Sequence, residues 1–545
     1  MIADIAIAEK SFGPKLLMSG IKFAIDAKEK VGVVGRNGVG KSTLFGILAG
    51  SDTDFTGEVT YRRGLTVVAT AQEHHAIGKQ TVLQYVLAGL PEYTELSRIV
   101  ETYPSTMGDD MRKIAQYTEA LQRFDDKGFY QIESDIEREL ETFQLPGIAH
   151  QPFASLSGGQ KRLVEVVKIM HSQADLALID EPTNHMDFVA KKQFIDWMNQ
   201  APEAMLVITH DRDVLAHVDR IIELKDGGCQ SFKGNYDAYL KQNAHSTGTA
   251  MNEFELIEKR IVNLKQKVID YQRLKEKSRN PQTIQKFKRL EQVSRTELAE
   301  LQAKEKPTFW IDKESAENLN YKVAAQYDKF KAKNIRMTMK SDGSRSKHVL
   351  VSAKQLSLGY DTPLFTAINI DLREGEALEL RGRNGAGKST LIKSLLSLDN
   401  SIQVYQGEMS LDNHIRVGVY EQEVSPTYFD MSLHDAIERV YLDKNQAINE
   451  TKIRQLMSDY LFTESDGQVP VARLSGGQKA RLQVIAMLAN DPQLLILDEP
   501  TNHLDLPSIE ELETALGKYG GAMLYVSHDD YFRQAMGGDV VQIGM

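Results

Sequence analysis

The sequence has only one cysteine and lacks any hydrophobic run long enough to cross a membrane. Cys229 alone cannot form an internal disulfide bond or a metal site built from cysteines. No apolar segment approaches the roughly 18 residues that a membrane-spanning helix needs. Near the N-terminus, Asp4 and Glu9 stand where a signal peptide would be basic and then apolar. These absences predict a protein that stays in the cytoplasm.

Positive charge is scarce over most of the chain and gathers in one segment. Residues 251–348 hold 23 Lys+Arg against 14 Asp+Glu, a local charge of +9. The net charge of the whole chain is −11, so the remaining residues together carry −20. An acidic body with a basic middle predicts that any nucleic-acid partner would contact the middle. At 545 residues the chain is also too long for one ordinary core, which favours two domains.

Two halves of the chain repeat the same motifs in the same order. The recurring pieces are VGVVGRNGVGKST (31–43) and LRGRNGAGKST (380–390), Gln72 and Gln422, LSGGQK from Leu156 and Leu474, LALIDEPTNHMD (176–187) and LLILDEPTNHLD (494–505), and His210 and His528. The offset between copies is 350 residues at the glutamine and 318 from LSGGQK onward. The first copy therefore carries about 32 extra residues, which we assign to the charged segment 91–145.

Each copy alternates short apolar runs with helical patterns, which is typical of a mostly parallel α/β sheet. The predicted architecture is two tandem α/β P-loop ATPase domains joined by a basic α-helical hairpin. We expect domain boundaries at 1–243, 244–348 and 349–545, with a helical insertion within 91–145.

The glycine-rich loops fit the pattern G-x-x-x-x-G-K-S, each after an apolar strand and before a helix. Backbone amides of such a loop surround phosphate oxygens, the lysine reaches the β and γ phosphates, and the serine hydroxyl ligates magnesium. The candidate phosphate-binding residues are Gly35, Arg36, Asn37, Gly38, Gly40, Lys41, Ser42 and Thr43 in the first copy, and Gly382, Arg383, Asn384, Gly385, Gly387, Lys388, Ser389 and Thr390 in the second.

Paired carboxylates follow the apolar strands LALI and LLIL, at the edge where an open α/β sheet binds its ligand. Asp180 and Asp498 suit Mg²⁺, whereas Glu181 and Glu499 suit polarisation of the attacking water. Structural hydrogen bonds at a strand end are the alternative, but they do not explain the pairing with lysine loops. We infer hydrolysis of a nucleoside triphosphate, which needs mainly positioning and charge neutralisation.

The ordered set of glycine loop, glutamine, SGGQ, DEPTNH and histidine resembles the ATP-binding-cassette superfamily. The resemblance implies two cassettes that face head to tail, so that each ATP contacts one lysine loop and the other cassette's SGGQ. It implies ATP-binding roles for Ser157, Gly158, Gly159, Gln160, Ser475, Gly476, Gly477 and Gln478, catalytic roles for Glu181, Glu499, His210, His528, Gln72 and Gln422, Mg²⁺ contacts from Ser42, Gln72, Asp180, Ser389, Gln422 and Asp498, and communication between cassettes by Asp187 and Asp505.

Two aromatic residues precede the glycine loops at similar distances. Phe12 and Tyr360 lie 23 and 22 residues before Gly35 and Gly382. By the same resemblance they would stack on adenine, with a place in the core as the alternative. The choice of ATP over GTP rests on the resemblance, because no residue here reads the purine edge.

The middle segment predicts two antiparallel helices separated by Ser-Arg-Asn-Pro at 278–281. The expected apolar seam is Phe254, Ile257, Ile261, Leu264, Val268 and Tyr271 on the first helix, and Ile284, Phe287, Leu290, Val293, Leu298 and Leu301 on the second. The candidate RNA-contact residues at the tip are Lys265, Lys267, Arg273, Lys275, Lys277, Arg279, Lys286, Lys288 and Arg289. A solvated helix face is the alternative, but basic charge at a projecting turn on an acidic protein favours phosphate contacts. A second basic stretch, 321–347, could extend that surface.

The whole chain resembles the ABC-F family of ribosome-associated ATPases, through DEPTNHMD, DEPTNHLD, GNYDAYL at 234–240 and the basic hairpin. The resemblance implies binding at the ribosomal tRNA exit site, with the hairpin directed at peptidyl-site tRNA and rRNA and the insertion acting as an arm. It also implies that ATP closes the cassettes of a single chain, a monomer, and that hydrolysis releases it.

Three alternatives stay open. The family also contains antibiotic-resistance proteins that protect the ribosome, and the short turn at 278–281 favours a translation factor over these. A tandem ATPase subunit of a transporter would not need a basic hairpin. A chromosome or repair ATPase would need longer coiled coils or zinc-binding cysteines.

Overall fold

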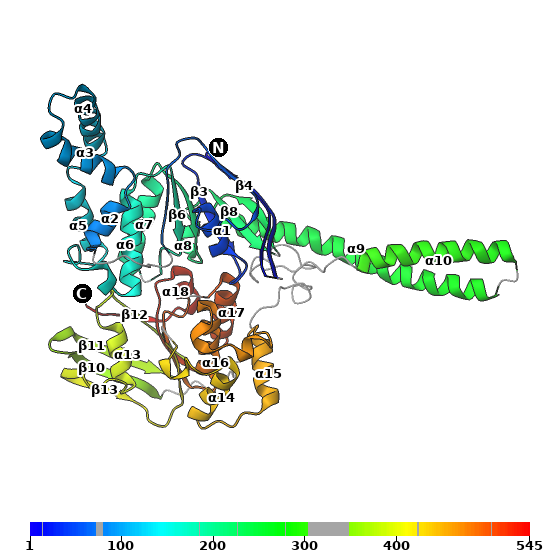
Figure 1. Cartoon of the computed structure of the whole chain (residues 1–545). Coiled ribbons are helices and arrows are strands. Elements are labelled where there is room, and N and C mark those ends of the chain that lie inside the picture. The colour runs from blue at the N-terminus through cyan, green and yellow to red at the C-terminus, as the bar shows by residue number, and fades with distance from the viewer. Residues whose placement is uncertain are drawn as a thin grey trace. The chain divides into compact units, whose positions relative to one another are not determined.

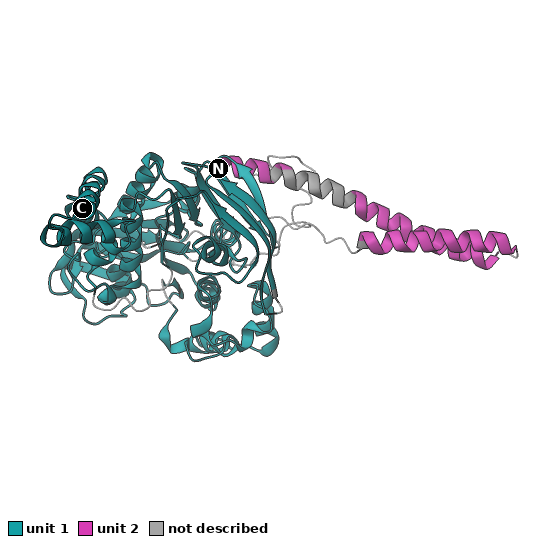
Figure 2. Cartoon of the chain, turned by 45° about the horizontal axis from the view of Figure 1, so that its top comes forward, with its two compact units in different colours: residues 1–236, 335–545 teal, residues 237–334 magenta. Residues whose placement is uncertain are grey.

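The computed structural model describes residues 1–13, 15–71, 80–184, 186–225, 227–277, 280–302, 348–421, 424–502 and 504–544 (Figure 1). The chain divides into two compact units, which are coloured separately in Figure 2. The first unit joins Met1–Tyr236 to Ile335–Met545, and the second is Asp237–Asn334. Among the helices described, none combines the length and the apolar character that a membrane crossing requires.

The first cassette lies in the first unit and combines two sheets with flanking helices (Figure 1). Its strands are β1 (Ala3–Phe12), β2 (Lys15–Ile25), β3 (Lys30–Gly35), β4 (Thr56–Tyr61), β5 (Val67–Ala69), β6 (Leu176–Asp180), β7 (Ala204–Ile208), β8 (Arg220–Lys225) and β9 (Gly228–Lys233). Its helices are α1 (Lys41–Leu48), α2 (Val82–Ala88), α3 (Tyr93–Thr106), α4 (Met111–Asp126), α5 (Ile132–Thr142), α6 (Gly158–His171), α7 (Phe188–Gln200) and α8 (Arg212–Leu215).

The central sheet has the order β5-β6-β7-β3-β8-β9 and is parallel except for β9. Strand β6 is buried at every residue because both of its faces are covered. Leu176 and Leu178 join the core beneath β1, β2 and α1, whereas Ala177 and Ile179 join the core formed with α2 and α6. This double burial explains the continuous apolar run before the carboxylates, and it brings Gly35 and Asp180 to the same edge of the sheet.

The phosphate loops end in glycines with left-handed backbone. Gly40 caps α1 with φ 108°, and Gly387 caps α13 (Lys388–Leu395) with φ 99°. A Cβ at Gly40 would lie 2.7 Å from the Met18 Cε atom, and one at Gly387 would lie 2.9 Å from the Phe365 ring. Both the conformation and the space therefore require glycine where each helix begins.

Helices α3 and α4 occupy most of the segment where the first copy is longer. In the second cassette, α15 (Glu450–Asp459) follows α14 (Leu433–Asp443) without any helix between them. Figure 1 shows α3 and α4 side by side, at a distance from the sheet strands. An aromatic group fixes their base, since the Tyr93 ring contacts Phe124 and Phe129 at centroid distances of 6.0 and 5.2 Å.

The second unit contains most of α9 (Tyr236–Lys277) and all of α10 (Pro281–Gln302), which pair antiparallel. The Arg260 guanidinium lies 2.8 Å from Glu297, and the Tyr271 and Phe287 rings stack 6.3 Å apart. On α9 the predicted seam positions Leu264 and Val268 are buried. The side chain of Phe254 lies outside the described residues.

The predicted seam of α10 is wrong at two positions. Leu290 and Val293 are exposed, at 36% and 58% of their surface, whereas Glu291 and Ser294 are buried. Glu291 tolerates this position because Gln272, Lys275 and Arg295 donate hydrogen bonds to its carboxylate. The seam therefore follows the spacing of 284, 287, 291, 294, 298 and 301, with polar residues in the middle.

The second cassette repeats the architecture of the first. Its strands are β10 (Val349–Gly359), β11 (Pro363–Arg373), β12 (Ala377–Arg381), β13 (Gln403–Leu411), β14 (Val417–Tyr420), β15 (Leu494–Asp498), β16 (Ala522–Val526) and β17 (Asp539–Gln542), and its remaining helices are α16 (Gly476–Leu488), α17 (Leu506–Leu516) and α18 (Asp530–Met536). The central sheet β14-β15-β16-β12-β17 is parallel throughout. The predicted fold class, two tandem α/β P-loop domains, is confirmed.

Candidate nucleotide-binding and catalytic site

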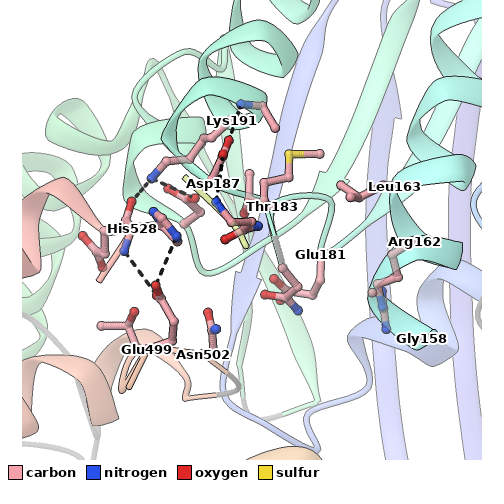
Figure 3. Close-up of a pocket in the computed structure, with 18 of the residues that line it drawn as sticks. Gly158, Arg162, Leu163, Glu181, Thr183, Asp187, Lys191, Glu499, Asn502 and His528 are labelled. Atoms are coloured by element: carbon pink, nitrogen blue, oxygen red, sulfur yellow. Dashed lines mark hydrogen bonds and ion pairs between the residues drawn. The ribbon is translucent and has the colours of Figure 1, made fainter. Parts of the chain in front are cut away.

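One cavity of about 1040 Å³ runs between the two cassettes within the first unit. Its walls include both glycine loops, both SGGQ segments, both carboxylate pairs and both histidines. Figure 3 shows Glu181 and Asp187 of the first cassette facing the same space as Glu499 and His528 of the second. The fold thus brings together motifs that are more than 300 residues apart in the sequence.

The two cassettes meet head to tail, through reciprocal contacts of aspartates with glycine loops. The Asn37 backbone N–H donates to Asp505 Oδ2 at 3.1 Å, and the Asn384 N–H donates to Asp187 Oδ2 at 3.3 Å. Asp187 is fully buried and Asp505 is nearly so. Gly477 of the second SGGQ segment also packs against the Asn37 side chain. Each phosphate loop is therefore closed by residues of the opposite cassette.

Both SGGQ segments start a helix by the same capping arrangement. The Ser157 hydroxyl accepts the Gln160 N–H at 3.3 Å, and the Gln160 side chain accepts the Ser157 N–H at 3.0 Å. Ser475 and Gln478 repeat both bonds. This capping box leaves the amides of the two central glycines at the N-terminus of α6 or α16, where the helix dipole favours an anion.

The loop lysines are buried and point back into their own loops. Lys41 Nζ donates to the Gly35 carbonyl at 2.7 Å, and Lys388 Nζ donates to the Gly382 carbonyl at 2.7 Å. Burial lowers the pKa of both lysines, against the opposing effect of nearby carboxylates such as Glu181 and Glu499. A phosphate beside either ammonium would favour its charged form, so the site chemistry suits an anionic ligand.

The two glutamates after the strands have an unusual backbone. Glu181 and Glu499 have φ values of 46° and 51°, a left-handed conformation that side-chain-bearing residues rarely adopt. The N–H of Glu181 donates to the Ile208 carbonyl, and that of Glu499 donates to the Val526 carbonyl. These bonds tie each glutamate to the end of the neighbouring strand, β7 or β16. The strained turn aims both carboxylates into the cavity, as functional sites often do.

Each glutamate is held by the histidine that follows the next strand. The His210 N–H donates to Glu181 Oε2 at 3.4 Å, and the His528 N–H donates to Glu499 Oε2 at 3.2 Å. The His528 ring lies closer to its glutamate, with Nε2 at 3.3 Å from Glu499 Oε1, than the His210 ring does to Glu181, at 3.6 Å. The same arrangement occurs in both sites, with a closer approach in the second, whose His528 and Glu499 are shown in Figure 3.

Burial changes the ionisation of these groups. Burial, reinforced by Asp180, raises the pKa of Glu181 to about 8, and burial raises that of Glu499 to about 7. Burial, with the help of the loop lysines, lowers the pKa of His210 and of His528 to about 3. The imidazoles are therefore neutral at pH 7, whereas the glutamates can take up or release a proton near that pH.

The predicted magnesium ligands of the second cassette are in contact. Ser389 Oγ donates to Asp498 Oδ2 at 2.9 Å, and burial raises the pKa of Asp498. In the first cassette, Ser42 and Asp180 line the same cavity. Hydroxyl and carboxylate oxygens are the hard ligands that Mg²⁺ prefers, so the residues of both sites suit the ion. Gln72 and Gln422, predicted as further ligands, lie outside the described residues.

The other predicted contacts have mixed positions. Phe12 and Tyr360 are exposed, at 56% and 38% of their surface, as a stacking platform requires. Seven of the nine basic residues predicted at the hairpin tip are exposed: Lys265, Lys267, Arg273, Lys277, Lys286, Lys288 and Arg289. Lys275 instead forms an ion pair with Glu291 at 2.8 Å, and Arg279 lies outside the described residues.

Sequence reasoning missed two polar side chains in this cavity. Gln144, in the loop after α5, donates to Asp187. Lys191 of α7 reaches the backbone of His528 in the other cassette. The sequence does distinguish Lys191, because the second copy has the apolar Ile509 at the equivalent position. This difference can be interpreted only once the contact between the cassettes is known.

Comparison with known proteins gives family matches over both cassettes. A family model described as ABC transporter matches residues 18–184 and 365–502, and a second model with that description matches residues 222–310. The chain is 31% identical, over 98% of its length and 78% of the relative, to the "Putative ATP-binding protein YdiF" of Bacillus subtilis.

Two further relatives carry more specific names. The chain is 28% identical to the Arabidopsis thaliana "ABC transporter F family member 5", over 98% of the chain and 74% of the relative. It is 28% identical to the Mycobacterium tuberculosis "Energy-dependent translational throttle protein EttA", over 96% of the chain and 88% of the relative. Among solved structures, a complex of "archaeal ribosomal stalk protein aP1 and archaeal ribosome recycling factor aABCE1" superimposes with a TM-score of 0.57 at 16% identity, covering 98% of this chain and 87% of the matched one, which supports the fold.

Proposed function

Because this chain belongs to the ABC-F family of ATP-binding-cassette proteins, we propose that it hydrolyses ATP at two sites between its cassettes and uses that cycle to act on the ribosome. The observation that carries the proposal is the reciprocal contact of Asn37 with Asp505 and of Asn384 with Asp187. Such a crossing makes each phosphate loop complete only when the cassettes are closed.

The first ATP site would consist of Lys41, Asp180, Glu181 and His210, completed by Ser475, Gly477 and Asp505. The second would consist of Lys388, Asp498, Glu499 and His528, completed by Ser157, Gly159 and Asp187. The lysine and the N-terminus of the opposite signature helix would hold the phosphates from two sides. Phe12 and Tyr360 would stack on the adenines.

The buried glutamates would position and deprotonate the attacking water. A pKa of about 8 for Glu181 and about 7 for Glu499 keeps each carboxylate near the pH at which a base works best. The neutral histidines would orient the glutamates and the γ-phosphate through hydrogen bonds. Mg²⁺, when bound, neutralises phosphate charge, and Ser42 with Asp180, or Ser389 with Asp498, would hold it, with Gln72 and Gln422 as further ligands.

The ribosomal part of the proposal rests on relatives and on charge. One relative is named a translational throttle protein, and the chain in the superimposed structure is named a ribosome recycling factor. The exposed basic residues of the α9–α10 tip would contact rRNA or tRNA phosphates at the tRNA exit site. Only three residues of sequence separate the end of α9 at Lys277 from the start of α10 at Pro281, which favours a translation factor over a protein that reaches a bound antibiotic. We place the activity in the cytoplasm, in a monomer, since one chain supplies both halves of each site.

The test is co-sedimentation of the Glu181→Gln, Glu499→Gln double variant with ribosomes. Both substitutions remove the base but keep the hydrogen-bonding shape, so ATP stays bound. We expect the variant to pellet with ribosomes only when ATP is present. The matched control adds Lys41→Ala and Lys388→Ala, which should abolish nucleotide binding and pelleting together. A folded double variant that binds ATP and stays in the supernatant would contradict the ribosomal function.

A further inference from the structure

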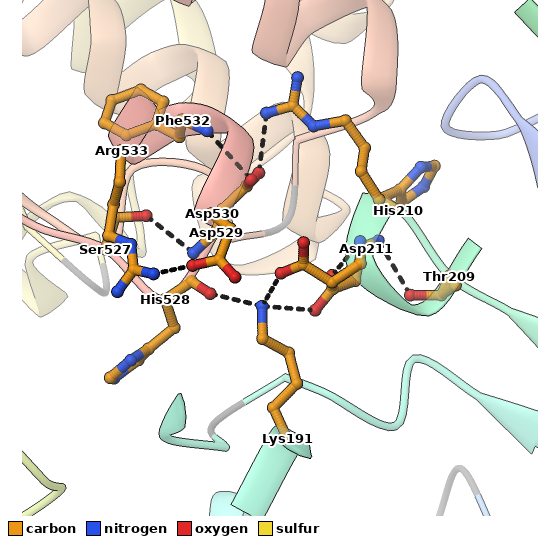
Figure 4. A network of polar contacts seen from close by, with 12 residues as sticks. Lys191, Thr209, His210, Asp211, Ser527, His528, Asp529, Asp530, Phe532 and Arg533 are labelled. Carbon is orange, nitrogen blue, oxygen red and sulfur yellow. Dashed lines mark hydrogen bonds and ion pairs between the residues drawn. The ribbon is translucent and has the colours of Figure 1, made fainter. Parts of the chain in front are cut away.

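A buried group of charged side chains joins the two cassettes beside the second histidine (Figure 4). We call it the interdomain ion cluster, and it consists of Lys191, Asp211, Arg212 and Asp213 of the first cassette with Glu513 and Asp529 of the second. Two cations thus face four carboxylates. Lys191 and Arg212 are buried, with 6% and 5% of their surface exposed. Such charges persist only where partners surround them.

Lys191 connects the first cassette to the backbone of the second histidine. Its ammonium donates to the His528 carbonyl at 2.5 Å and to Asp213 Oδ2 at 2.5 Å, and it lies 3.4 Å from Asp211. Figure 4 shows the ammonium between Asp211 and the His528 backbone. The contact therefore exists only while the cassettes are closed.

Arg212 holds the residue next to that histidine. Its guanidinium donates to Asp529 Oδ2 at 2.9 Å and to both Glu513 oxygens, at 3.2 and 2.5 Å. The same group stacks over the Tyr531 ring at 4.9 Å. Bidentate charged hydrogen bonds fix position as well as contributing energy, so the segment 528–531 is held from the first cassette at two points.

Within the part of the chain that the structure describes, the first site has no counterpart of this cluster. The offset of 318 residues places Ile509 opposite Lys191, Asp530 opposite Arg212 and Tyr531 opposite Asp213. Ile509 carries no hydrogen-bond donor, and Asp530 pairs with Arg533 of its own helix. Among the described residues, the histidine backbone is therefore held by a cation of the other cassette at the second site alone.

The restrained backbone leads directly to the catalytic base. The His528 N–H donates to Glu499 Oε2, and the next N–H, that of Asp529, donates to Ser527 Oγ at 3.1 Å. Moving the His528 carbonyl would therefore move the donor that orients Glu499. We infer that Lys191, supported by Arg212, is a positioning residue for ATP hydrolysis at the second site, so that the two sites are unequal although both hold complete motifs.

The charge balance of the cluster gives Lys191 a second effect. Without its ammonium, Asp211 and Asp213 face Asp529 with only Arg212 to compensate. Like charges at close range repel, which adds to the displacement of Asp529 and of the His528 backbone beside it. A neutral side chain at 191 therefore loosens the second site in two ways, by releasing the His528 carbonyl and by repulsion between the carboxylates.

This inference rests on the proposed ATPase activity, and its test measures each site separately in the full chain. Glu181→Gln leaves the base of the second site only, and Glu499→Gln leaves that of the first. Adding Lys191→Met should lower kcat about tenfold or more in the Glu181→Gln background, with KM for ATP within about twofold, because Lys191 acts through Glu499 and not on the nucleotide. In the Glu499→Gln background kcat should stay within about twofold.

Three variants control the measurement. Lys192→Met removes the same charge from the exposed neighbouring position and should change neither background. Lys191→Arg keeps a cation and should restore most of the activity. Lys191→Gln, which keeps a donor without the charge, replaces Lys191→Met if the latter does not fold. An equal loss in both backgrounds, or no loss in either, would overturn the inference.

A second measurement does not depend on turnover at a single site. Amide hydrogen exchange is followed in the ATP-bound Glu181→Gln, Glu499→Gln chain, with and without Lys191→Met. Exchange should accelerate in the peptide covering 527–532 and stay unchanged in that covering 35–43, the phosphate loop of the first site, which does not contact the cluster. Equal acceleration in both peptides would overturn the inference, whereas an unsubstituted chain that hydrolyses no ATP would overturn the proposed function instead.

Discussion

Gly477 lies where the second signature helix meets the first phosphate loop. A Cβ at this residue would lie 2.1 Å from Asn37 Nδ2 and 2.9 Å from Asn37 Cγ, so an alanine requires the Asn37 side chain, or the loop that carries it, to move. The residue is in the first turn of α16, where alanine is a better helix former than glycine. An alanine at this position should therefore disturb closure of the first site without destabilising the cassette.

We predict that Gly477→Ala lowers ATP hydrolysis about tenfold in the Glu499→Gln background, where only the first site keeps its base. Thermal stability of the chain without ATP should stay the same or rise slightly, because the helix gains propensity. Steady-state ATPase assays and a melting curve check both parts. Adding Asn37→Ala should relieve the clash. Gly477→Ala should therefore reduce the rate less when Asn37 is already alanine than when Asn37 is present, and an equal reduction in both chains would contradict the steric explanation.

At the scale of a helix, α6 holds the end of β5 immediately before Gln72. Glu165 Oε2 accepts the Ala71 N–H at 2.8 Å, and Lys168 donates to Glu165 at 2.6 Å and to the Ala69 carbonyl at 3.3 Å. Both charged residues are buried. In the second cassette the equivalent positions are uncharged, with Gln483 in place of Glu165 and Ala486 in place of Lys168. Gln483 donates to the Glu421 carbonyl at 2.7 Å.

We predict that Glu165→Gln destabilises the folded chain by about 3 kcal/mol, because Lys168 is left buried without its carboxylate. Adding Lys168→Met removes the stranded charge and should recover most of that loss, in line with the neutral pair of the second cassette. Urea unfolding followed by circular dichroism measures both changes. Gln483→Glu is the matched control, and a double variant no more stable than Glu165→Gln would show that the ion pair is not the cause.

The elements that were predicted correctly from the sequence are those whose sequence pattern and structural cause lie in the same short segment. The buried strand before Asp180 and the loop that ends at Gly40 are local in this sense. The seam of α10 was misassigned because Leu290 and Val293 are apolar, whereas the position that faces α9 is taken by Glu291, whose partners come from both helices.

At the scale of the whole molecule, the cassettes were predictable from repetition but their differences were not. The offset of 318 residues shows that Lys191 and Arg212 lack equivalents, yet only the closed arrangement shows that both act on the opposite cassette. Contacts between domains that lie outside the repeated motifs combine residues that are unrelated in sequence, so no periodicity predicts them. The two ATP sites therefore look alike as motifs and differ in what surrounds them.

In the proposed function the basic hairpin recognises the ribosome, and its charge can be reversed by substitutions outside the cassettes. Lys277, Lys286 and Arg289 are exposed, whereas Lys275 is engaged with Glu291 and is left unchanged. In the Glu181→Gln, Glu499→Gln chain with ATP, we predict that changing these three residues to glutamate weakens ribosome binding about tenfold or more at moderate salt. The loss should shrink as salt rises, since lost phosphate contacts reduce the salt dependence of binding.

The control for this variant carries the same change in net charge on exposed lysines of the cassettes, Lys28, Lys393 and Lys518. Binding isotherms from co-sedimentation at several salt concentrations compare the two variants. When the same charge changes are made in chains that keep Glu181 and Glu499, ATP hydrolysis without ribosomes should be equal in both. Equal weakening by both variants would indicate a general effect of charge. Unchanged binding by the hairpin variant would show that α9 and α10 do not contact RNA, and the ribosome would then have to be recognised by another surface, such as the α3–α4 insertion.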